Sequence, residues 1–258
     1  MRITTVNSGK GGSLKSTTAW ALATWLNKNG YKALVIDFEP NANVSGFFDA
    51  DYKSKPTMYH VFNEEVLIEE AVQYTKQGDI IAGNSTLGKI QALFSNDILN
   101  GIKALKNQMP KLKTLGYTHV IIDNQPLVGT MTTLQSATSA HDMIITLHPD
   151  PPTLQGLENL ANGLTEAIQF NKELKIDGIL LGRDKGTNNE KVYADKIREW
   201  LEPLNTKIYE SIIREGISVQ EAQGNVATIW DYAPNDNPTL DYLAFIKEYL
   251  NLEKEQNG

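Results

Sequence analysis

Residues 8–18 constrain the fold of this chain more than any other segment. They read Ser-Gly-Lys-Gly-Gly-Ser-Leu-Lys-Ser-Thr-Thr, follow an apolar stretch at Ile3–Val6 and lead into a helical pattern at Ser16–Leu26. A glycine-rich loop in this position turns its backbone N–H groups toward an anion at the helix N-terminus, where the helix dipole also favours negative charge. The order of strand, loop and helix therefore predicts a phosphate-binding loop and not an ordinary tight turn.

The side chains of this loop suit a nucleoside triphosphate. Lys15 is placed to reach the β- and γ-phosphates, the Ser16 hydroxyl is placed to bind magnesium, and Thr17 adds a polar group beside it. Gly9, Lys15 and Ser16 fit the pattern G-x-x-x-x-G-K-[ST], but Leu14 stands where the second glycine belongs. If that position needs a positive φ, a leucine there stores about 1–3 kcal/mol of strain.

Apolar, β-rich stretches alternate with helical patterns along the chain. The stretches are Ile3–Val6, Ala33–Ile36, Ile80–Ala82, His119–Ile122, Met143–Leu147 and Gly178–Leu181. This alternation predicts an α/β fold with a doubly wound, mostly parallel sheet flanked by helices. The binding site of such a sheet forms beyond the C-terminal ends of its strands. We expect one domain over residues 1–252 and a disordered tail at 253–258.

The segment from residue 56 to residue 115 is expected to be mainly helical, with one short strand. Its predicted helices are Val66–Lys76, Leu87–Phe94 and Asp97–Gln108. A turn-forming cluster at 234–238 precedes a last predicted helix at Thr239–Leu250.

Acidic side chains follow two of the expected strands. Asp37 and Glu39 stand two residues apart and so point the same way, and Asp123 follows an apolar run in the manner of a Walker B aspartate. Each acid alone has an ordinary explanation as a helix cap or turn residue. With the phosphate loop nearby, we expect Ser16, Asp37 and Asp123 to hold Mg²⁺, which takes few carboxylates plus phosphate oxygens and waters.

Composition excludes several classes of protein. The chain has no cysteine, which rules out disulfides, thiolate catalysis, Cys-ligated zinc and iron–sulfur clusters. A net charge of −7 disfavours an extended DNA-binding surface. No apolar stretch approaches the roughly 18 residues that span a membrane, and Met1-Arg2 leads straight into a strand, with no room for a signal peptide. We therefore expect a cytoplasmic protein.

Three motifs together resemble the ParA/MinD family of deviant Walker A ATPases, which have the SIMIBI-type P-loop NTPase fold. Residues 10–17, Lys-Gly-Gly-Ser-Leu-Lys-Ser-Thr, are similar to the family's K-G-G-V-G-K-T-T. Residues 37–41, Asp-Phe-Glu-Pro-Asn, resemble D-x-D-P-Q, and residues 121–126, Ile-Ile-Asp-Asn-Gln-Pro, resemble I-I-D-T-P-P. Residues 154–157 and 219–222 are similar to its A-L-E-G-L and L-S-E-A, so the matches run in order along most of the chain.

The resemblance implies a homodimer that sandwiches two ATP molecules with Mg²⁺. Lys10, as the signature lysine, would cross to the partner's phosphates and offset charge on the transferring group. The other implied phosphate-binding residues are Gly11, Gly12, Ser13, Leu14, Lys15, Ser16 and Thr17.

The residues implied in hydrolysis depart from the family's pattern. Glu39 would orient the attacking water beside Asp37, but the family has Asp at position 39, and the extra methylene shifts the carboxylate by about 1 Å. Asn124 and Gln125 also replace the family's Thr and Pro. Together with Leu14, these departures imply a slow ATPase.

Within the family, the chain most resembles ParA-type partition ATPases. That resemblance implies a switch in plasmid or chromosome segregation, whose ATP dimer binds nonspecific DNA until a ParB-type partner stimulates hydrolysis. The family's DNA-contact motif P-R-N-V-R-L-S-E-A aligns with residues 214–222, where Glu215 and Ser218 replace both arginines, so DNA binding is in doubt. The remaining candidates are Arg183, Lys185, Lys191 and Arg214 for DNA, and Arg183, Arg214 and Glu215 for the nucleotide base.

Three functions stay open on the sequence. They are a partition-type ATPase switch, a catalytically weakened nucleotide-dependent interaction protein, and a small-molecule ligase of the same fold. A MinD-like protein needs a basic C-terminal helix to bind membrane. The segment 240–256 carries more acidic than basic residues here, so anionic lipid would repel it and we expect no membrane partner.

Overall fold

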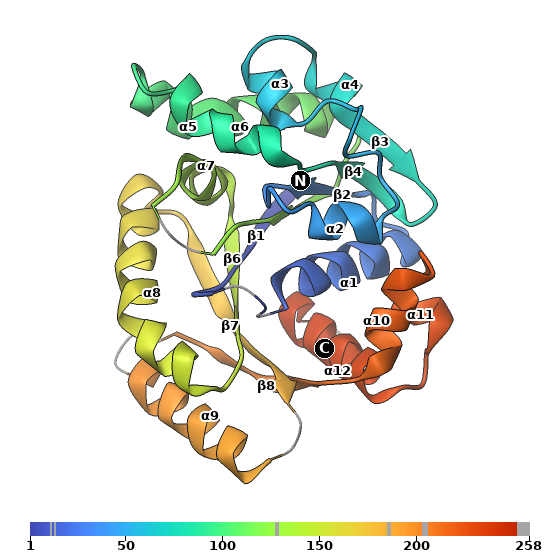
Figure 1. Ribbon diagram of the computed structural model, residues 1–258, viewed down its shortest axis with the longest axis vertical. Helices are drawn as coiled ribbons and strands as arrows, with labels where there is room; N and C mark the ends of the chain where they lie inside the picture. The colour runs from blue at the N-terminus through green and yellow to red at the C-terminus, as the bar shows by residue number, and fades with distance from the viewer. Residues whose placement is uncertain (11, 13, 127–128, 185–186, 203–205, 252–258) are drawn as a thin grey trace.

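Eight strands form a single sheet in the order β3-β4-β2-β5-β1-β6-β7-β8 (Figure 1). The structure, a computed structural model, describes residues 1–10, 12, 14–126, 129–184, 187–202 and 206–251, without the side chains at 183 and 184. The strands are β1 Arg2–Asn7, β2 Ala33–Asp37, β3 Val72–Thr75, β4 Gly78–Ile81, β5 His119–Asp123, β6 Asp142–Leu147, β7 Lys175–Asp184 and β8 Ile208–Arg214. Among the strand pairs of the described residues only β3–β4 is antiparallel, which confirms the predicted doubly wound, mostly parallel α/β sheet.

The central position of β1 places the phosphate loop. β1 lies between β5 and β6, so the strand order runs outward in opposite directions on its two sides. A crevice opens beyond the carboxyl ends of the strands at such a reversal, and ligands of open α/β sheets bind there. The loop that follows β1 therefore lies at the expected binding position.

Helices cover both faces of the sheet (Figure 1). They are α1 Lys15–Lys28, α2 Asn43–Phe47, α3 Met58–Phe62, α4 Ile68–Ala71, the 3₁₀ helix η1 Ser85–Lys89, α5 Ile90–Leu93, α6 Ile98–Thr114, α7 Met131–Ser139, α8 Pro151–Phe170, α9 Asn188–Leu201, α10 Ile217–Gly224, α11 Ile229–Tyr232 and α12 Asn237–Leu250. The core on one face includes residues of α1, α10, α11 and α12, and the core on the other includes residues of α6, α7, α8 and α9.

Side chains of the central strands alternate between these two cores. In β2, Leu34 and Ile36 join the core under α6 and α7, whereas Ala33 and Val35 join the core under α1. Strands that are buried on both faces read as continuous apolar runs. That is why the central strands were evident in the sequence.

The predicted helix over Val66–Lys76 is wrong. The structure has the short helix α4 and then β3, which forms an antiparallel hairpin with β4. The Thr75 hydroxyl donates to the Gly78 carbonyl within the turn, and the Gln73 amide pairs with the backbone of Asp51. These contacts outweigh the helical spacing of the apolar residues. Residues 56–115 therefore contain two strands, β3 and β4, and not the single strand that was predicted. Strand β8 was also missing from the predicted strands.

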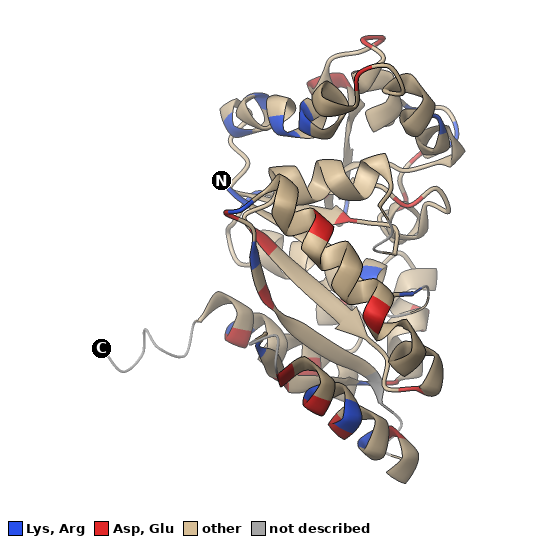
Figure 2. Ribbon diagram, turned by 90° about the vertical axis from the view of Figure 1, so that its left-hand side faces the viewer, with Lys and Arg blue, Asp and Glu red and all other residues tan. Residues whose placement is uncertain are grey.

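Charges are distributed differently on neighbouring helices (Figure 2). In the sequence, the charged residues of α6 are all lysines, those of α8 are all glutamates, and α9 mixes both signs. Within the described residues, no helix has the length and hydrophobicity that crossing a bilayer requires. The expected disordered tail lies outside the described residues.

Candidate nucleotide-binding site

The phosphate loop bends through left-handed backbone before α1 begins. Gly12 has a φ of 74°, and Leu14, the N-cap of α1, has φ 65° and ψ 9°. The Leu14 carbonyl accepts the N–H of Thr18 at 2.8 Å and so starts the helix. This confirms that position 14 needs a positive φ, a conformation that costs about 1–2 kcal/mol for a residue with a Cβ atom.

A cavity of about 510 Å³ opens beside this loop. Four parts of the chain line it: the loop and the first turn of α1, the segment after β2, Pro126 after β5, and the end of β8 with α10 and α12. The predicted phosphate-binding residues among the lining are Gly12, Leu14, Lys15, Ser16 and Thr17. Gly11 and Ser13 lie outside the described residues.

Lys15 is buried at the first turn of α1, with 6% of its surface exposed. Burial raises the pKa of both Glu39 and Asp123, and the positive charge of Lys15 partly opposes each rise, which places the ammonium group near these two acids. A buried ammonium group needs anions around it, because burial removes the solvation of its charge. This end of the sheet therefore combines a cation and acids in the manner of a site for Mg²⁺ and phosphate.

Asp123, at the end of β5, is fully buried, and among the described residues neither of its carboxylate oxygens has a hydrogen-bond partner of normal geometry. Burial and the charge of Asp37 raise the pKa of Asp123 well above its ordinary value, while Ser16 and Lys15 act in the opposite direction. A buried, unpaired carboxylate is costly unless a cation or a proton satisfies it. The donor chemistry fits a magnesium ion, which prefers oxygen ligands.

Asp37, at the end of β2, is equally buried but fully hydrogen-bonded. Its Oδ2 accepts the N–H and the hydroxyl of Ser45 at 3.1 and 2.6 Å, and its Oδ1 accepts the N–H of Glu39 at 2.8 Å. Burial raises its pKa to about 6, although these hydrogen bonds oppose the rise. Through these hydrogen bonds Asp37 positions residues 38–45, and its contact with magnesium stays a prediction.

Glu39 lines the cavity and is half-buried. Burial raises its pKa, and Lys15 partly opposes that rise. Its Oε1 accepts from the amide of Asn41 at 3.3 Å. The structure thus brings Glu39, Lys15 and Ser16 to one cavity, as the sequence predicted.

The predicted magnesium residues supply two carboxylates and one hydroxyl. Among the residues that the structure describes, no three His, Cys, Asp or Glu side chains gather in a way that could hold a metal ion. Asp37 and Asp123 are buried and are not among the residues that line the cavity, whereas Ser16 lines it. A magnesium ion at this position would need phosphate oxygens and waters to complete its shell.

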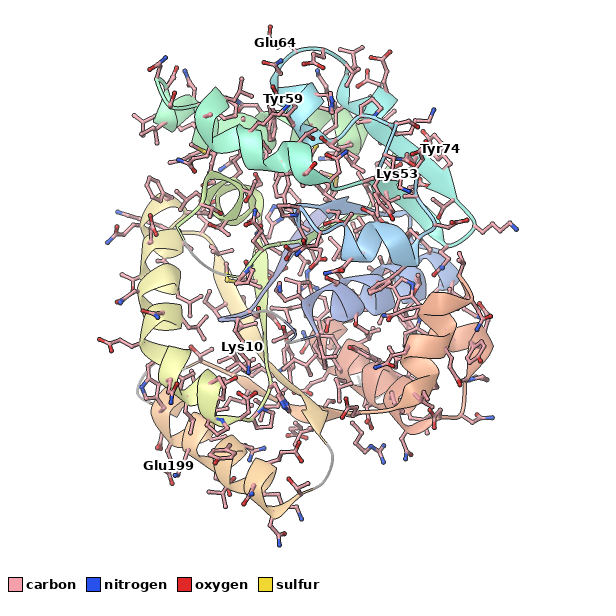
Figure 3. All side chains as sticks on the ribbon, viewed as in Figure 1. Lys10, Lys53, Tyr59, Glu64, Tyr74 and Glu199 are labelled. Carbon is pink, nitrogen blue, oxygen red and sulfur yellow. The ribbon has the colours of Figure 1, made fainter. Side chains whose placement is uncertain are left out.

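Lys10 does not line the cavity but pairs with Asp150, the N-cap residue of α8. Figure 3 labels Lys10, whose ammonium group donates to Asp150 Oδ2. The two side chains are 28% and 23% exposed, and His148 Nε2 lies 3.7 Å from the same carboxylate oxygen. Despite partial burial, hydrogen bonds from Lys10 and Thr153 lower the pKa of Asp150.

The residues predicted for the base and for DNA are spread over different parts of the fold. Arg214 and Glu215 line the cavity, but the Arg214 guanidinium also makes two hydrogen bonds to Asp241, at 2.8 and 2.5 Å. Lys191 lies on α9 beside a separate hollow. The side chain of Arg183 and all of Lys185 lie outside the described residues.

Sequence reasoning did not assign several residues that line the cavity. They are Asn41, Asn43, Phe47, Pro126, Ile213, Gly216, Val219, Gln220, Gln223 and Tyr242. Asn41 and Asn43 follow the acidic motif directly, so proximity in sequence could have indicated them. Tyr242 belongs to the apolar face of α12, and nothing in its local pattern separates it from the core.

The chain matches the AAA_31 family, described as an AAA domain, over residues 1–176. It is 24% identical over 264 residues to the chromosome partitioning protein ParA of Caulobacter vibrioides, covering 100% of this chain and 97% of that relative. Together with the loop geometry, these matches decide the family. The chain belongs to the ParA/MinD family of P-loop ATPases.

Solved structures share the fold of this ParA/MinD-family ATPase. Apo McdA of Cyanothece superposes with a TM-score of 0.83 at 20% identity, covering 97% of this chain and 99% of that one. Cobyrinic acid a,c-diamide synthase of Mycobacterium smegmatis, with a bound ATP analogue and magnesium, has a TM-score of 0.84 at 21% identity, covering 100% and 97%. At such identities the likeness concerns the fold alone. The ATP analogue and magnesium are bound by the synthase.

Proposed function

We propose that this protein is a ParA-type partition ATPase of the cytoplasm that binds Mg-ATP, dimerises on it and acts as a switch in plasmid or chromosome segregation. The observation that carries the proposal is the unpaired, buried carboxylate of Asp123 behind a phosphate loop whose lysine is also buried. The full-length similarity to a chromosome partitioning protein supports the biological role.

In this proposal the phosphate loop, the end of β2 and the end of β5 have different roles. Lys15 and the loop backbone bind the phosphates, while Ser16 and Asp123 hold magnesium, directly or through water. Magnesium supplies charge neutralisation on the phosphate oxygens when bound. Asp37 orders the segment that carries Glu39, and Glu39 orients the attacking water from the cavity wall.

Lys10 connects nucleotide binding to dimerisation. To reach a partner's phosphates it must leave Asp150, with which it pairs in its own subunit. The pair is partly exposed, and such a pair contributes about 1 kcal/mol or less, so bound phosphate can displace it. We propose that this exchange accompanies formation of the ATP dimer, and that a ParB-type partner stimulates its slow hydrolysis.

Sedimentation velocity tests the proposal directly. The protein would be run with Mg-ATP, with Mg-ADP and without nucleotide, at one stated salt concentration. Lys10→Ala should abolish the ATP-dependent dimer, and Lys15→Ala should weaken nucleotide binding itself. Lys53→Ala is the control, because Lys53 is exposed and does not line the cavity (Figure 3). Undiminished dimerisation of both loop variants would refute the sandwich dimer.

One observation favours a second candidate, a nucleotide-dependent switch that acts on a protein without binding DNA. Arg214, the cation at the start of the expected DNA motif, is engaged by Asp241, and Glu215 and Ser218 stand in place of arginines. Adding nonspecific duplex DNA to the same sedimentation runs separates the two. An ATP dimer that co-sediments with DNA supports the partition switch, and a dimer that ignores DNA supports the protein-directed one.

A further inference from the structure

Leu14 lies against a glycine on strand β7, and this glycine leaves space for the leucine side chain. The residue adopts a left-handed conformation in which glycine is the ordinary choice. Its side chain is partly buried and packs against the core under α1. The atoms it approaches on β7 belong to Gly182.

Gly182 leaves the space that the Leu14 side chain occupies. A Cβ atom built on Gly182 would lie 2.2 Å from Leu14 Cδ1, and 3.4 Å from Cβ of Ile213 on the adjacent strand. A separation of 2.2 Å is far inside van der Waals contact, so no side chain fits at position 182 while Leu14 stays in place. Leu14 also lines the nucleotide cavity, so a Leu14 side chain displaced by a Cβ at position 182 would alter that cavity.

We propose that Leu14 and Gly182 are a matched pair in which β7 holds the phosphate loop in its nucleotide-binding conformation. The apolar contact of Leu14 with the sheet offsets the strain of its left-handed backbone and fixes the N–H groups that would face the phosphates. Leu14 and Gly182 are thus positioning residues for nucleotide binding. This inference rests on the proposed function, because it concerns the affinity of the same site.

A mutant cycle with a matched control tests the pair. Dissociation constants for Mg-AMPPNP, a non-hydrolysable ATP analogue, would be measured by titration calorimetry at a temperature where every variant is folded. The variants are Gly182→Ala, Leu14→Gly and the double variant. Gly156→Ala on α8 is the control, because its new Cβ would meet no atom within 4 Å. Melting temperatures without nucleotide would be recorded for the same proteins.

We expect Gly182→Ala to weaken Mg-AMPPNP binding about tenfold or more, and Gly156→Ala to leave it unchanged. In the Leu14→Gly background the clash is gone, so adding Gly182→Ala should change the affinity by less than about threefold. Equal losses in both backgrounds would overturn the pair. A Gly182→Ala protein that melts earlier but binds the analogue normally would also overturn it, since the contact would then serve packing alone.

Leu14→Ala keeps the inference testable if Gly182→Ala fails to fold. It retains the left-handed strain and loses most of the contact with Gly182, so its affinity should fall below that of Leu14→Gly. An affinity equal to that of the unsubstituted chain would contradict the proposal. If the unsubstituted chain binds no Mg-AMPPNP, the proposed function fails and the effect on affinity fails with it. The melting temperatures of the cycle then show separately whether the two side chains are matched.

Discussion

The ends of β2 and β5 carry the same residue in nearly the same environment and use it differently. Asp37 and Asp123 are register partners on adjacent parallel strands, and both are fully buried. The Asp37 carboxylate accepts three hydrogen bonds, whereas the Asp123 carboxylate accepts none from the described residues. Although both aspartates are equally buried, Asp37 supports the fold at the end of β2, and Asp123 leaves an unsatisfied carboxylate at the end of β5.

The chain that follows each strand explains the difference. After β2 the backbone folds back over Asp37, so that Glu39 and Ser45 present their N–H groups to it. After β5 the Asn124 N–H bonds to the carbonyl of Val6 instead and so gives nothing to Asp123. Buried polar groups without partners are typical of functional sites. Such groups lower the stability of the folded protein, and function is the reason that they are kept.

Asp123→Asn should have the largest effect and should separate function from stability. We expect ATP turnover to fall at least about a hundredfold, because the proposed magnesium site would lose its charged ligand. The unfolding free energy without nucleotide should stay level or rise, since an unpaired buried charge is removed. Steady-state kinetics and urea denaturation measure the two, with the exposed Asp195→Asn as control. If Asp123→Asn lowered the unfolding free energy by more than about 1 kcal/mol, Asp123 would support the fold as Asp37 does, and the proposed difference between the two residues would be wrong.

In contrast to Asp123→Asn, Asp37→Asn should destabilise the protein and lower its unfolding free energy by about 3 kcal/mol. The asparagine NH₂ group would face buried donors on Glu39 or Ser45 and leave them without an acceptor. Urea denaturation measures the loss. A change below about 0.5 kcal/mol would mean that the two strand ends are energetically alike.

The pH dependence of stability should sharpen the comparison further. The pKa of Asp37 is about 6 in the folded protein against an ordinary 3.8, and the pKa of Asp123 is also raised. The folded state therefore binds these protons more tightly than the unfolded chain does. Their stabilising contribution is complete below pH 3.8 and is lost as the pH rises through the folded pKa, by about 3 kcal/mol for Asp37.

Asp123→Asn isolates one of these two groups. Its stability relative to the unsubstituted protein should increase as the pH rises from about 4 to 7, because only the unsubstituted protein must ionise Asp123. Urea denaturation at several pH values gives this difference directly. A relative stability that falls with pH would contradict the raised pKa.

Ser45→Ala should have the smallest effect, about 1–2 kcal/mol of unfolding free energy. It removes the hydroxyl that donates to Asp37 and that accepts the N–H of Gly83 at 2.9 Å. Combined with Asp37→Asn, the loss should be less than additive, because both changes disrupt one network. Full additivity in denaturation experiments would show that Ser45 stabilises the segment independently of Asp37.

The sequence predicted the parts of this protein that depend on local pattern. The central strands read as apolar runs, the phosphate loop carried its lysine and hydroxyl in the required order, and Asp123 ended its strand as expected. The helix predicted over Val66–Lys76 failed because hairpin pairing and the contact of Gln73 with Asp51 outweigh local spacing. Tyr242 at the cavity had no local signal at all.

By itself, the sequence determined the fold family, the position of the loop and the misfit of Leu14 within it, because these depend on residues close together in the chain. Only the tertiary structure decided that Asp37 is satisfied and Asp123 is not, that Lys10 pairs with Asp150, and that Gly182 makes room for Leu14. Each of these depends on which distant backbone or side chain lies within a few ångströms. Residue type and spacing along the chain do not specify such contacts, since hydrogen bonding and close packing act through space.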